Sequence, residues 1–230
     1  MSAAPLESAP AVRQRQGGKL VAWAILAGLL ATASYGARFA GGEAADDVLY
    51  QWATFAGALV QYGIMLILIL AISRGFNRSL LALEPPTSWR RAALLAVGAL
   101  VAIIAVNAVL STFLDAGNEQ GLVPDAWDSS RAAPFLANAV VVTLVAPFVE
   151  ELLYRGLGFG VLAPFVGPWP AIVITGVAFG LAHGLVLGLP ILSIFGIVLC
   201  WLRWRTGSVY PGMIVHAIFN AMALAVAVAL

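Results

Sequence analysis

Residues 145–155 read VAPFVEELLYR, which places two glutamates and an arginine at the end of an apolar run that begins near Pro134. A run of roughly 20 apolar residues is long enough to cross a membrane as a helix. A charged side chain inside a bilayer costs on the order of 3 kcal/mol on insertion scales, so Glu150 and Glu151 are expected to face a polar cavity rather than lipid. This stretch therefore predicts a helix of a membrane protein and, on it, a functional site.

The composition as a whole supports a membrane fold. Of the 230 residues, 62% are hydrophobic and 10% are charged, and the mean hydropathy is +0.96. A soluble domain carries about 25% charged residues, so this chain has too few polar groups to cover a surface in water. The net charge of +1 gives no indication of a nucleic-acid partner. The single cysteine, Cys200, cannot form a disulfide within the chain and is expected to be buried.

Seven apolar segments predict an all-α fold, a polytopic transmembrane helical bundle of seven or eight spans. Residues 1–18 are predicted to form a disordered cytoplasmic tail, 19–132 the N-terminal transmembrane helices, and 133–230 the helical core that carries the candidate site. A short apolar stretch at 157–166 is an eighth helix, a re-entrant piece or a continuation of the fourth helix. The predicted spans are 20–35, 48–72, 92–114, 134–153, 169–187, 189–204 and 211–230.

The charged connections predict a cytoplasmic N-terminus in the cell (plasma) membrane, because basic connections collect on the cytoplasmic side. Basic residues lie in the N-terminal tail, after the second span and at the end of the sixth, whereas the first and third connections are acidic. Arg155 then falls at the cytoplasmic end of the fourth span. The basic residues are Arg13, Arg15, Lys19, Arg74, Arg78, Arg90, Arg91, Arg203 and Arg205, and the acidic ones are Glu43, Asp46, Asp47, Asp115, Glu119, Asp125 and Asp128.

Four residues suited to acid–base chemistry lie inside the apolar segments: Glu150, Glu151, His183 and His216. Glu151 and Arg155 are four residues apart, so they can pair on one helix face. Glu150 points about 100° away and is free to face elsewhere. Taken singly, an intramembrane histidine is often only an interhelical hydrogen-bonding residue, and a glutamate–arginine pair is often structural. The coincidence of all four in three apolar segments favours a catalytic site.

Two further spacings place partners beside the histidines. Phe179 and His183 are four residues apart, as are His216 and Asn220, although Phe179 alone is best explained by packing. A carboxylate in a partly dehydrated pocket can act as a general base on water, which makes Glu150 the candidate base. The histidines can stabilise an oxyanion, protonate a leaving amine or bind a metal, and Asn220 can orient His216 or hydrogen-bond the oxyanion. No serine or cysteine stands at a nucleophile spacing, which favours activated water.

Three motifs therefore occur in order along the apolar segments: Glu150-Glu151-x-x-x-Arg155, Phe179-x-x-x-His183 and His216-x-x-x-Asn220. Their context includes Tyr154-Arg155-Gly156, and Thr206-Gly207-Ser208 before Pro211. In order and separation they resemble the signature of the CPBP family, the CAAX prenyl protease and bacteriocin-processing intramembrane peptidases, also called the Abi family. The resemblance covers about 134–230, and the first three spans are not diagnostic.

The resemblance implies an intramembrane endopeptidase that hydrolyses membrane-associated substrates, such as prenylated CAAX-type proteins or leader peptides. It implies that Glu150 activates water, that His183 assists or binds that water, and that His216 and Asn220 stabilise the oxyanion. The expected partners are membrane lipid and a peptide or protein substrate. The residues that would support the site are Glu151, Arg155 and Phe179.

A metal and two other functions remain as alternatives. Glu150, His183 and His216 are a plausible ligand set for a divalent metal such as zinc. The helix-borne H-E-x-x-H of zinc peptidases is absent, which favours a mechanism with no obligate metal. A non-catalytic membrane protein, such as a bacteriocin-immunity factor or a scaffold, is the second functional hypothesis. A proton-coupled transporter is the third, and the lack of visible inverted repeats weakens it.

The depths of the candidate residues conflict in the simplest topology. His183 is about 14 residues into a span that starts near Trp169, or roughly 20 Å deep. The loop charges instead put Glu150 near the cytoplasmic surface. Either the fourth helix continues past Arg155, or residues 157–188 do not form a simple hairpin.

Overall fold

The structure, a computed structural model, describes residues 9–41, 47–114, 119 and 127–229. Within these ranges the chain forms helices and no strand, which confirms the predicted all-α class. The helices are α1 (Ala9–Ala40), α2 (Trp52–Ser73), α3 (Trp89–Leu110), α4 (Ala132–Val140), α5 (Ala146–Glu151), α6 (Phe159–Val166), α7 (Pro168–Leu181), α8 (Leu189–Thr206) and α9 (Tyr210–Ala229). Shorter 3-10 or π segments are η1 (Val48–Tyr50), η3 (Ser129–Arg131), η4 (Val141–Val145) and η5 (Leu152–Gly158).

Six helical stretches of the described chain are long and apolar enough to cross a membrane: Gln16–Ala40, Trp52–Ser73, Trp89–Leu110, Ser129–Val166, Leu189–Thr206 and Tyr210–Val228. The remaining predicted span corresponds to α7, which has 14 residues. Its length of about 21 Å is short of the roughly 30 Å of a hydrocarbon core. The transmembrane bundle is thus confirmed, with six candidate spans and one shorter apolar helix where seven or eight full spans were predicted.

The first helix begins earlier than predicted. Residues 9–18, assigned to a disordered tail, are helical because α1 starts at Ala9. Pro10 stands in the first turn, where a proline is tolerated, and no later proline interrupts the helix. Residues 1–8 of the predicted tail lie outside the described residues, as do the acidic residues Glu43, Asp46, Asp115 and Asp125 of the predicted connections.

The fourth predicted span is part of a much longer helix. The segments from α4 to α6 follow one another without interruption through the centre of the bundle, and the candidate span Ser129–Val166 has 38 residues. The stretch 157–166 therefore continues the fourth helix. The predicted position of Arg155 at the end of a span is wrong, since Arg155 lies within this helix with no exposed surface. The charge of Arg155 does not mark a cytoplasmic connection, because its ion pair with Glu151 allows the arginine to be buried inside the protein.

A glycine turn removes the conflict between the depths of Glu150 and His183. Gly167 has a φ of 84°, a left-handed conformation that favours glycine, and α7 folds back from it toward the centre. Glu150 lies 17 residues before Gly167, and His183 lies 16 residues after it. At 1.5 Å per residue both lie about 25 Å from this turn. The two side chains are therefore brought to a similar depth by one hairpin.

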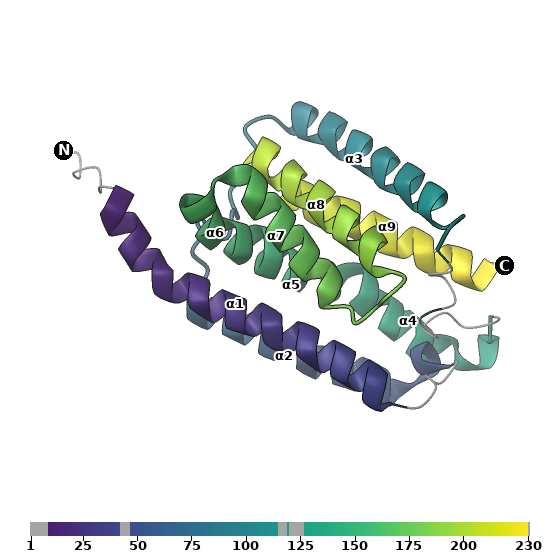
Figure 1. The fold of residues 1–230 in the computed structure, drawn as a ribbon. Helices are drawn as coiled ribbons and strands as arrows, with labels where there is room; N and C mark the ends of the chain where they lie inside the picture. The colour runs from purple at the N-terminus through teal and green to yellow at the C-terminus, as the bar shows by residue number, and fades with distance from the viewer. Residues whose placement is uncertain (1–8, 42–46, 115–118, 120–126, 230) are drawn as a thin grey trace.

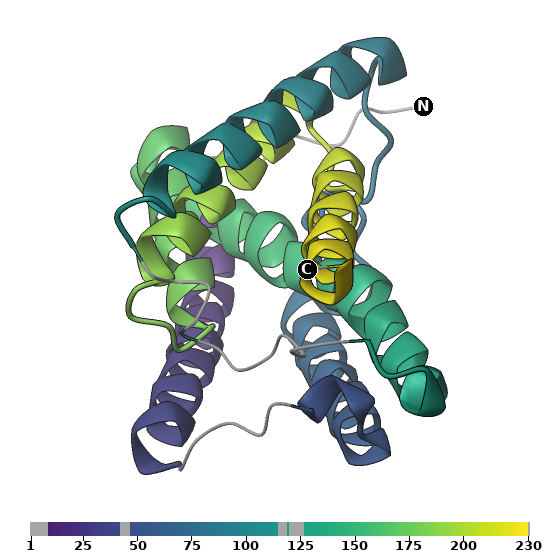
Figure 2. The same ribbon diagram turned by 90° about the vertical axis from the view of Figure 1, so that its right-hand side faces the viewer.

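The other helices surround this central hairpin (Figures 1 and 2). The helices α1 and α2 lie on one side of it, whereas α3 lies across α8 and α9 on the opposite side. The hairpin of α7 and α8 is close, because a Cβ added to Gly196 would lie 2.6 Å from the Gly176 carbonyl oxygen. The N-terminus lies at one end of the bundle, with the α2–α3 connection and the α8–α9 turn, and the C-terminus lies at the other (Figure 1).

Candidate active site

The two adjacent glutamates at the end of α5 have different surroundings. Glu151 has no exposed side-chain surface, whereas Glu150 keeps 12% of its side chain exposed. Neighbouring residues on a helix point about 100° apart, which explains the difference. Glu150 Oε1 accepts a hydrogen bond of 2.9 Å from the hydroxyl of Tyr62 on α2. Glu150 is therefore the carboxylate that opens to a cavity, and Glu151 is held inside.

Arg155 neutralises the buried carboxylate of Glu151. Its Nη1 lies 2.8 Å from Glu151 Oε1, and both side chains are fully buried. Its Nη2 donates to the Gly196 carbonyl at 3.2 Å, and its guanidinium lies 4.4 Å from the centre of the Phe179 ring. Arg155 Nη1 makes no well-aligned hydrogen bond, so its contact with Glu151 is an ion pair held by charge. The pair predicted from the sequence thus lies behind the cavity.

His216 on α9 lies between the two glutamates. Its Nδ1 is 3.1 Å from Glu151 Oε1, and its Nε2 is 3.7 Å from Glu150 Oε2. An ionised carboxylate only accepts hydrogen bonds, so this geometry places the proton of Nδ1 toward Glu151 and leaves Nε2 to face Glu150. Gly212 permits the close approach, since a Cβ there would lie 2.7 Å from Glu151 Oε2. The pattern, a carboxylate that orients an imidazole, is that of catalytic triads.

His183 lies in the turn that follows α7. Its Nδ1 is 2.8 Å from the Phe179 carbonyl oxygen, so Nδ1 carries the proton and Nε2 is the free acceptor of the neutral ring. Gly184, with a φ of 66°, lies in the same turn and would collide with the backbone of Ser34 if it had a Cβ. The Ser34 hydroxyl donates to the Ala182 carbonyl at 2.7 Å. Contacts with α1 therefore hold the imidazole in place.

Asn220 of α9 forms a hydrogen bond with the backbone of the central helix. Its Nδ2 donates to the Val142 carbonyl at 2.9 Å. In the π segment η4 the Ala146 N–H bonds to the carbonyl of Val141, five residues back, so the next donor would be the N–H that Pro147 lacks. The structure pairs Asn220 with that orphaned carbonyl rather than with His216. Asn220 also lines the cavity at Glu150, where its second N–H is available.

Replacing Asn220 by alanine is expected to lower the free energy of unfolding by about 1 kcal/mol, because the half-buried Val142 carbonyl loses its donor. Thermal unfolding of the purified protein in detergent measures this effect. Met222→Ala, a change of an exposed side chain on the same helix, is the matched control and is expected to have a smaller effect. Equal stability of the Asn220→Ala variant and the wild type would contradict the role of Asn220 in capping this carbonyl.

Two cavities meet at Glu150. One, of about 170 Å³, lies between α1, α2 and α5, and the other, of about 340 Å³, extends toward α8 and α9. The side chains that line both are Tyr62, Glu150 and His183. The smaller cavity adds the polar groups of Ser34 and Gln61, whereas most residues that line the larger one are apolar. The site therefore has one polar side and one apolar side, with the carboxylate between them.

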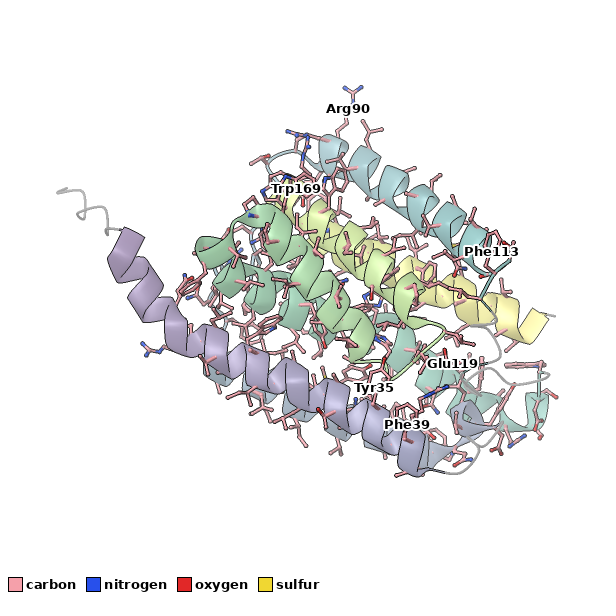
Figure 3. The ribbon with its side chains drawn as sticks, in the orientation of Figure 1. Tyr35, Phe39, Arg90, Phe113, Glu119 and Trp169 are labelled. Atoms are coloured by element: carbon pink, nitrogen blue, oxygen red, sulfur yellow. The ribbon has the colours of Figure 1, made fainter. Side chains whose placement is uncertain are left out.

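A carboxylate of the α3–α4 connection fixes the loop that carries His183. Glu119 accepts hydrogen bonds of 2.7 Å from the amides of Val186 and Gly188, and lies 2.7 Å from Arg38. Burial raises the pKa of Glu119, but these amide bonds and the charge of Arg38 lower it more, so its net pKa lies below the usual 4.5. Figure 3 shows Glu119 near Tyr35, whose hydroxyl donates to the Leu185 carbonyl.

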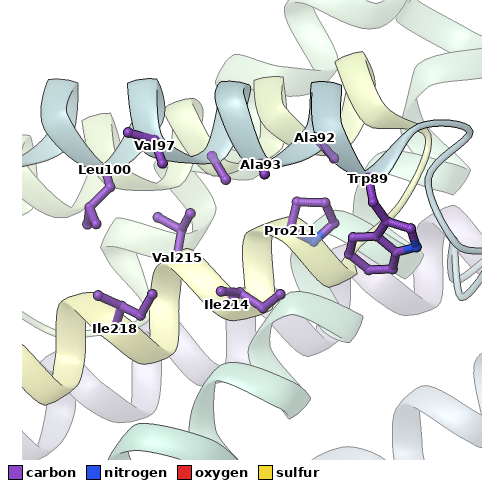
Figure 4. Close-up of a pocket in the computed structure, with 10 residues that line it drawn as sticks. Trp89, Ala92, Ala93, Val97, Leu100, Pro211, Ile214, Val215 and Ile218 are labelled. Atoms are coloured by element: carbon purple, nitrogen blue, oxygen red, sulfur yellow. The ribbon is translucent and has the colours of Figure 1, made fainter.

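A third cavity is lined by apolar side chains. It is an apolar groove of about 200 Å³ between α3 and α9, lined by Trp89, Val97, Pro211, Ile214 and Ile218 among others (Figure 4). None of the residues that line it is ionisable. His216 and Asn220 line the inner cavity, so the groove occupies a different face of α9.

The residues predicted from the three motifs come together, and the structure adds Tyr62 to them. Tyr62 was missed because it lies outside the motifs, although Gln61 and Tyr62 form a polar pair within an apolar span and could have signalled it. The structure also bears on the possible metal site. Among the described residues, no three His, Cys, Asp or Glu side chains converge closely enough to hold an ion. The contact of His216 Nδ1 with Glu151 leaves Nε2 as the ring nitrogen that lies toward Glu150.

Comparison with known proteins agrees with the motifs. Residues 132–222 match a protein-family model described as type II CAAX prenyl endopeptidase Rce1-like. No curated protein and no solved structure matches the chain. The matched segment contains all the motif residues from Glu150 to Asn220, whereas Tyr62 lies outside it. The predicted resemblance to the CPBP family is confirmed, since residues 132–222 are similar to the Rce1-like family of type II CAAX prenyl endopeptidases.

Proposed function

We propose that this chain is an intramembrane endopeptidase, a hydrolase that cleaves peptide bonds with water activated by Glu150. The observation that carries the proposal is the position of Glu150, where a polar cavity meets an apolar one. The polar cavity can supply water within the bundle, and the apolar cavity can accommodate a membrane-associated substrate. The family of residues 132–222, a family of endopeptidases, supports the same reaction.

Glu150 acts as the general base in the proposed reaction. Tyr62 donates to Oε1, which leaves Oε2 to accept a proton from water. His183 offers a free Nε2 beside the same cavities and accepts the second hydrogen of that water, so its oxygen lone pair is directed at the substrate carbonyl. The water oxygen bonds to the carbonyl carbon while its proton moves to Glu150. Glu150 then gives this proton to the amine as the C–N bond breaks.

His216 and Asn220 stabilise the oxyanion. A protonated His216 carries an N–H on Nε2, and its Nδ1–H is directed at Glu151. With this proton the charges of Arg155, Glu151, His216 and Glu150 sum to zero, which limits the electrostatic cost of holding all four inside a bilayer. Asn220 also lines the cavity and can supply the second N–H of its amide. Preorganised donors of this kind typically contribute about 3 kcal/mol each to the transition state. No step of this mechanism passes through a metal.

The proposed substrate is a membrane-associated peptide or protein. The apolar side chains of Leu192, Phe195, Phe219 and Leu224 line the larger cavity and suit a lipid chain or an apolar segment next to the scissile bond. Prenylated CAAX-type termini and leader peptides are the two substrate classes. We place the N-terminus in the cytoplasm of a cell and the bundle in the plasma membrane, because most basic connections lie at the N-terminal end.

The test is hydrolysis by the purified chain in liposomes. Three quenched fluorescent peptides are compared: a farnesylated CAAX peptide, the same peptide without the lipid, and a leader peptide. Cleavage of a membrane-anchored peptide is expected, with the cleaved bond identified by mass spectrometry, and the activity is expected to persist after treatment with a chelator. If no peptide is cleaved while cells that carry Glu150→Ala keep the phenotype of the wild type, the chain is a non-catalytic membrane protein.

A further inference from the structure

Tyr154 of the central helix carries a hydroxyl to which the proposed mechanism assigns no role. It lies four residues after Glu150, a spacing that places two side chains near the same face of a helix. Both side chains line the polar cavity of about 170 Å³, together with Tyr62 and His183. Tyr154 is therefore part of the wall of the cavity that can supply water to the base.

The ring of Tyr154 is fixed by packing. Only 1% of the residue is exposed. The ring packs edge to face on Phe179, with the two ring centroids 5.5 Å apart and the ring planes at 87°. Phe179 lies four residues before His183, just as Tyr154 lies four residues after Glu150. The aromatic pair thus lies one helical turn from Glu150 and His183 and holds the phenol in a constant position relative to them.

The hydroxyl of Tyr154 is a hydrogen-bonding group without a partner in the protein. Its oxygen is buried and forms no hydrogen bond with any residue that the structure describes. The hydroxyl of Tyr62, the other tyrosine of the cavity, already donates to Glu150 Oε1. An unpaired buried hydroxyl is unfavourable, and native proteins usually pair such a group with protein or with ordered water. The cavity is larger than the space that one water needs, so water can serve as this partner.

We propose that Tyr154 is a further catalytic residue, whose hydroxyl donates a hydrogen bond to the water that Glu150 activates. The proposal rests on the peptidase function proposed above. In that reaction the two hydrogens of the water are directed at Glu150 and His183, and one lone pair of its oxygen attacks the substrate carbonyl. The second lone pair accepts from Tyr154, so four directed contacts fix the orientation of the water. Tyr154 keeps its proton throughout, and no covalent bond to it forms or breaks.

Tyr154→Phe tests this role, because it removes the hydroxyl and keeps the ring that packs on Phe179. We expect kcat on the anchored peptide to fall about tenfold, the effect of one neutral hydrogen bond, and KM to stay the same. The melting temperature in detergent is expected not to fall, because the hydroxyl has no partner among the described residues.

Tyr210→Phe is the matched control, with the opposite expectation. The hydroxyl of Tyr210 donates to the Leu83 carbonyl at 3.2 Å, and Tyr210 lines neither cavity at Glu150. Removal of this hydroxyl is therefore expected to lower the melting temperature and to leave kcat unchanged.

X-ray radiolysis of the full chain in detergent detects the water without a measurement of activity. Radicals formed from a held water label the side chain beside it even where that side chain is buried, and mass spectrometry identifies the labelled residue. We expect stronger labelling of Tyr154 than of Trp23. Trp23 is a buried aromatic residue that lines neither cavity at Glu150, and its indole N–H donates to the Leu153 carbonyl.

Three results would overturn the proposal. A Tyr154→Phe variant as fast as the wild type, with Glu150→Gln inactive, would exclude Tyr154 from the reaction and leave Glu150 as the base. A lower melting temperature with unchanged kcat, as expected for Tyr210→Phe, would indicate a structural role. Labelling of Tyr154 no stronger than that of Trp23 would exclude a held water, even if the chain cleaves none of the peptides. A Glu150→Gln variant with full activity would instead contradict the proposed function itself.

Discussion

Replacing Glu150 by glutamine is expected to lower the rate of peptide hydrolysis by about 10²–10⁴-fold, the usual contribution of a general base. Glutamine keeps the size of the side chain and can still accept the hydrogen bond from Tyr62, but it cannot take a proton from water. Because Glu150 is not the fully buried member of the pair, the variant is expected to fold. The rate is measured with the anchored peptide in liposomes, and melting in detergent confirms folding.

Tyr62→Phe is the graded comparison for this experiment. It removes only the hydroxyl that donates to Glu150 Oε1, so a loss of about tenfold or less is expected. The Glu150→Gln variant is also expected to retain bound substrate without cleaving it, which makes it suitable for trapping and identifying the natural peptide. A folded Glu150→Gln variant that cleaves the anchored peptide at the rate of the wild type would rule out Glu150 as the base.

The fold class could be predicted because it follows from composition and from the length of the apolar runs. The path of the central helix could not be predicted from the sequence. Arg155 has the charge of a connection residue, and its contacts with Glu151, the Gly196 carbonyl and the Phe179 ring make it compatible with the interior. The π segment η4 could not be predicted either, because the carbonyl of Val142, which Pro147 leaves without a donor, is paired with Asn220, 78 residues further along the chain. Such pairings depend on tertiary contacts.

The motif spacing placed residues on helix faces but could not give their partners. A spacing of four residues placed Asn220 beside His216, where it could orient the imidazole or bind the oxyanion, but its described hydrogen bond is with the Val142 carbonyl. His216 instead contacts Glu151, and Tyr62 of α2 contacts Glu150. These contacts join segments far apart in the sequence, so periodicity within one helix carries no information about them. The roles of Glu150, His183 and Asn220 in catalysis stay predictions.

The second large effect is expected at Arg155, where methionine should lower the free energy of unfolding by about 3–5 kcal/mol. Arg155 and Glu151 have no exposed side-chain surface, so the substitution leaves a buried carboxylate without its countercharge. It also removes the donor to the Gly196 carbonyl and the contact with the Phe179 ring. Melting in detergent measures the loss, and Arg205→Met, which removes an exposed arginine, is the control.

A double variant separates the charge of Arg155 from its packing. Glu151→Gln together with Arg155→Met removes both charges of the pair, and a buried ion pair replaced by neutral groups of similar volume is often close to neutral for stability. We therefore expect the double variant to melt well above the Arg155→Met variant. Its hydrolysis should stay low, because the neutral amide at position 151 no longer provides the negative charge that balances a protonated His216 at the oxyanion. If the double variant is no more stable than the single one, packing of Arg155 against Phe179 rather than charge balance holds the centre of the bundle together.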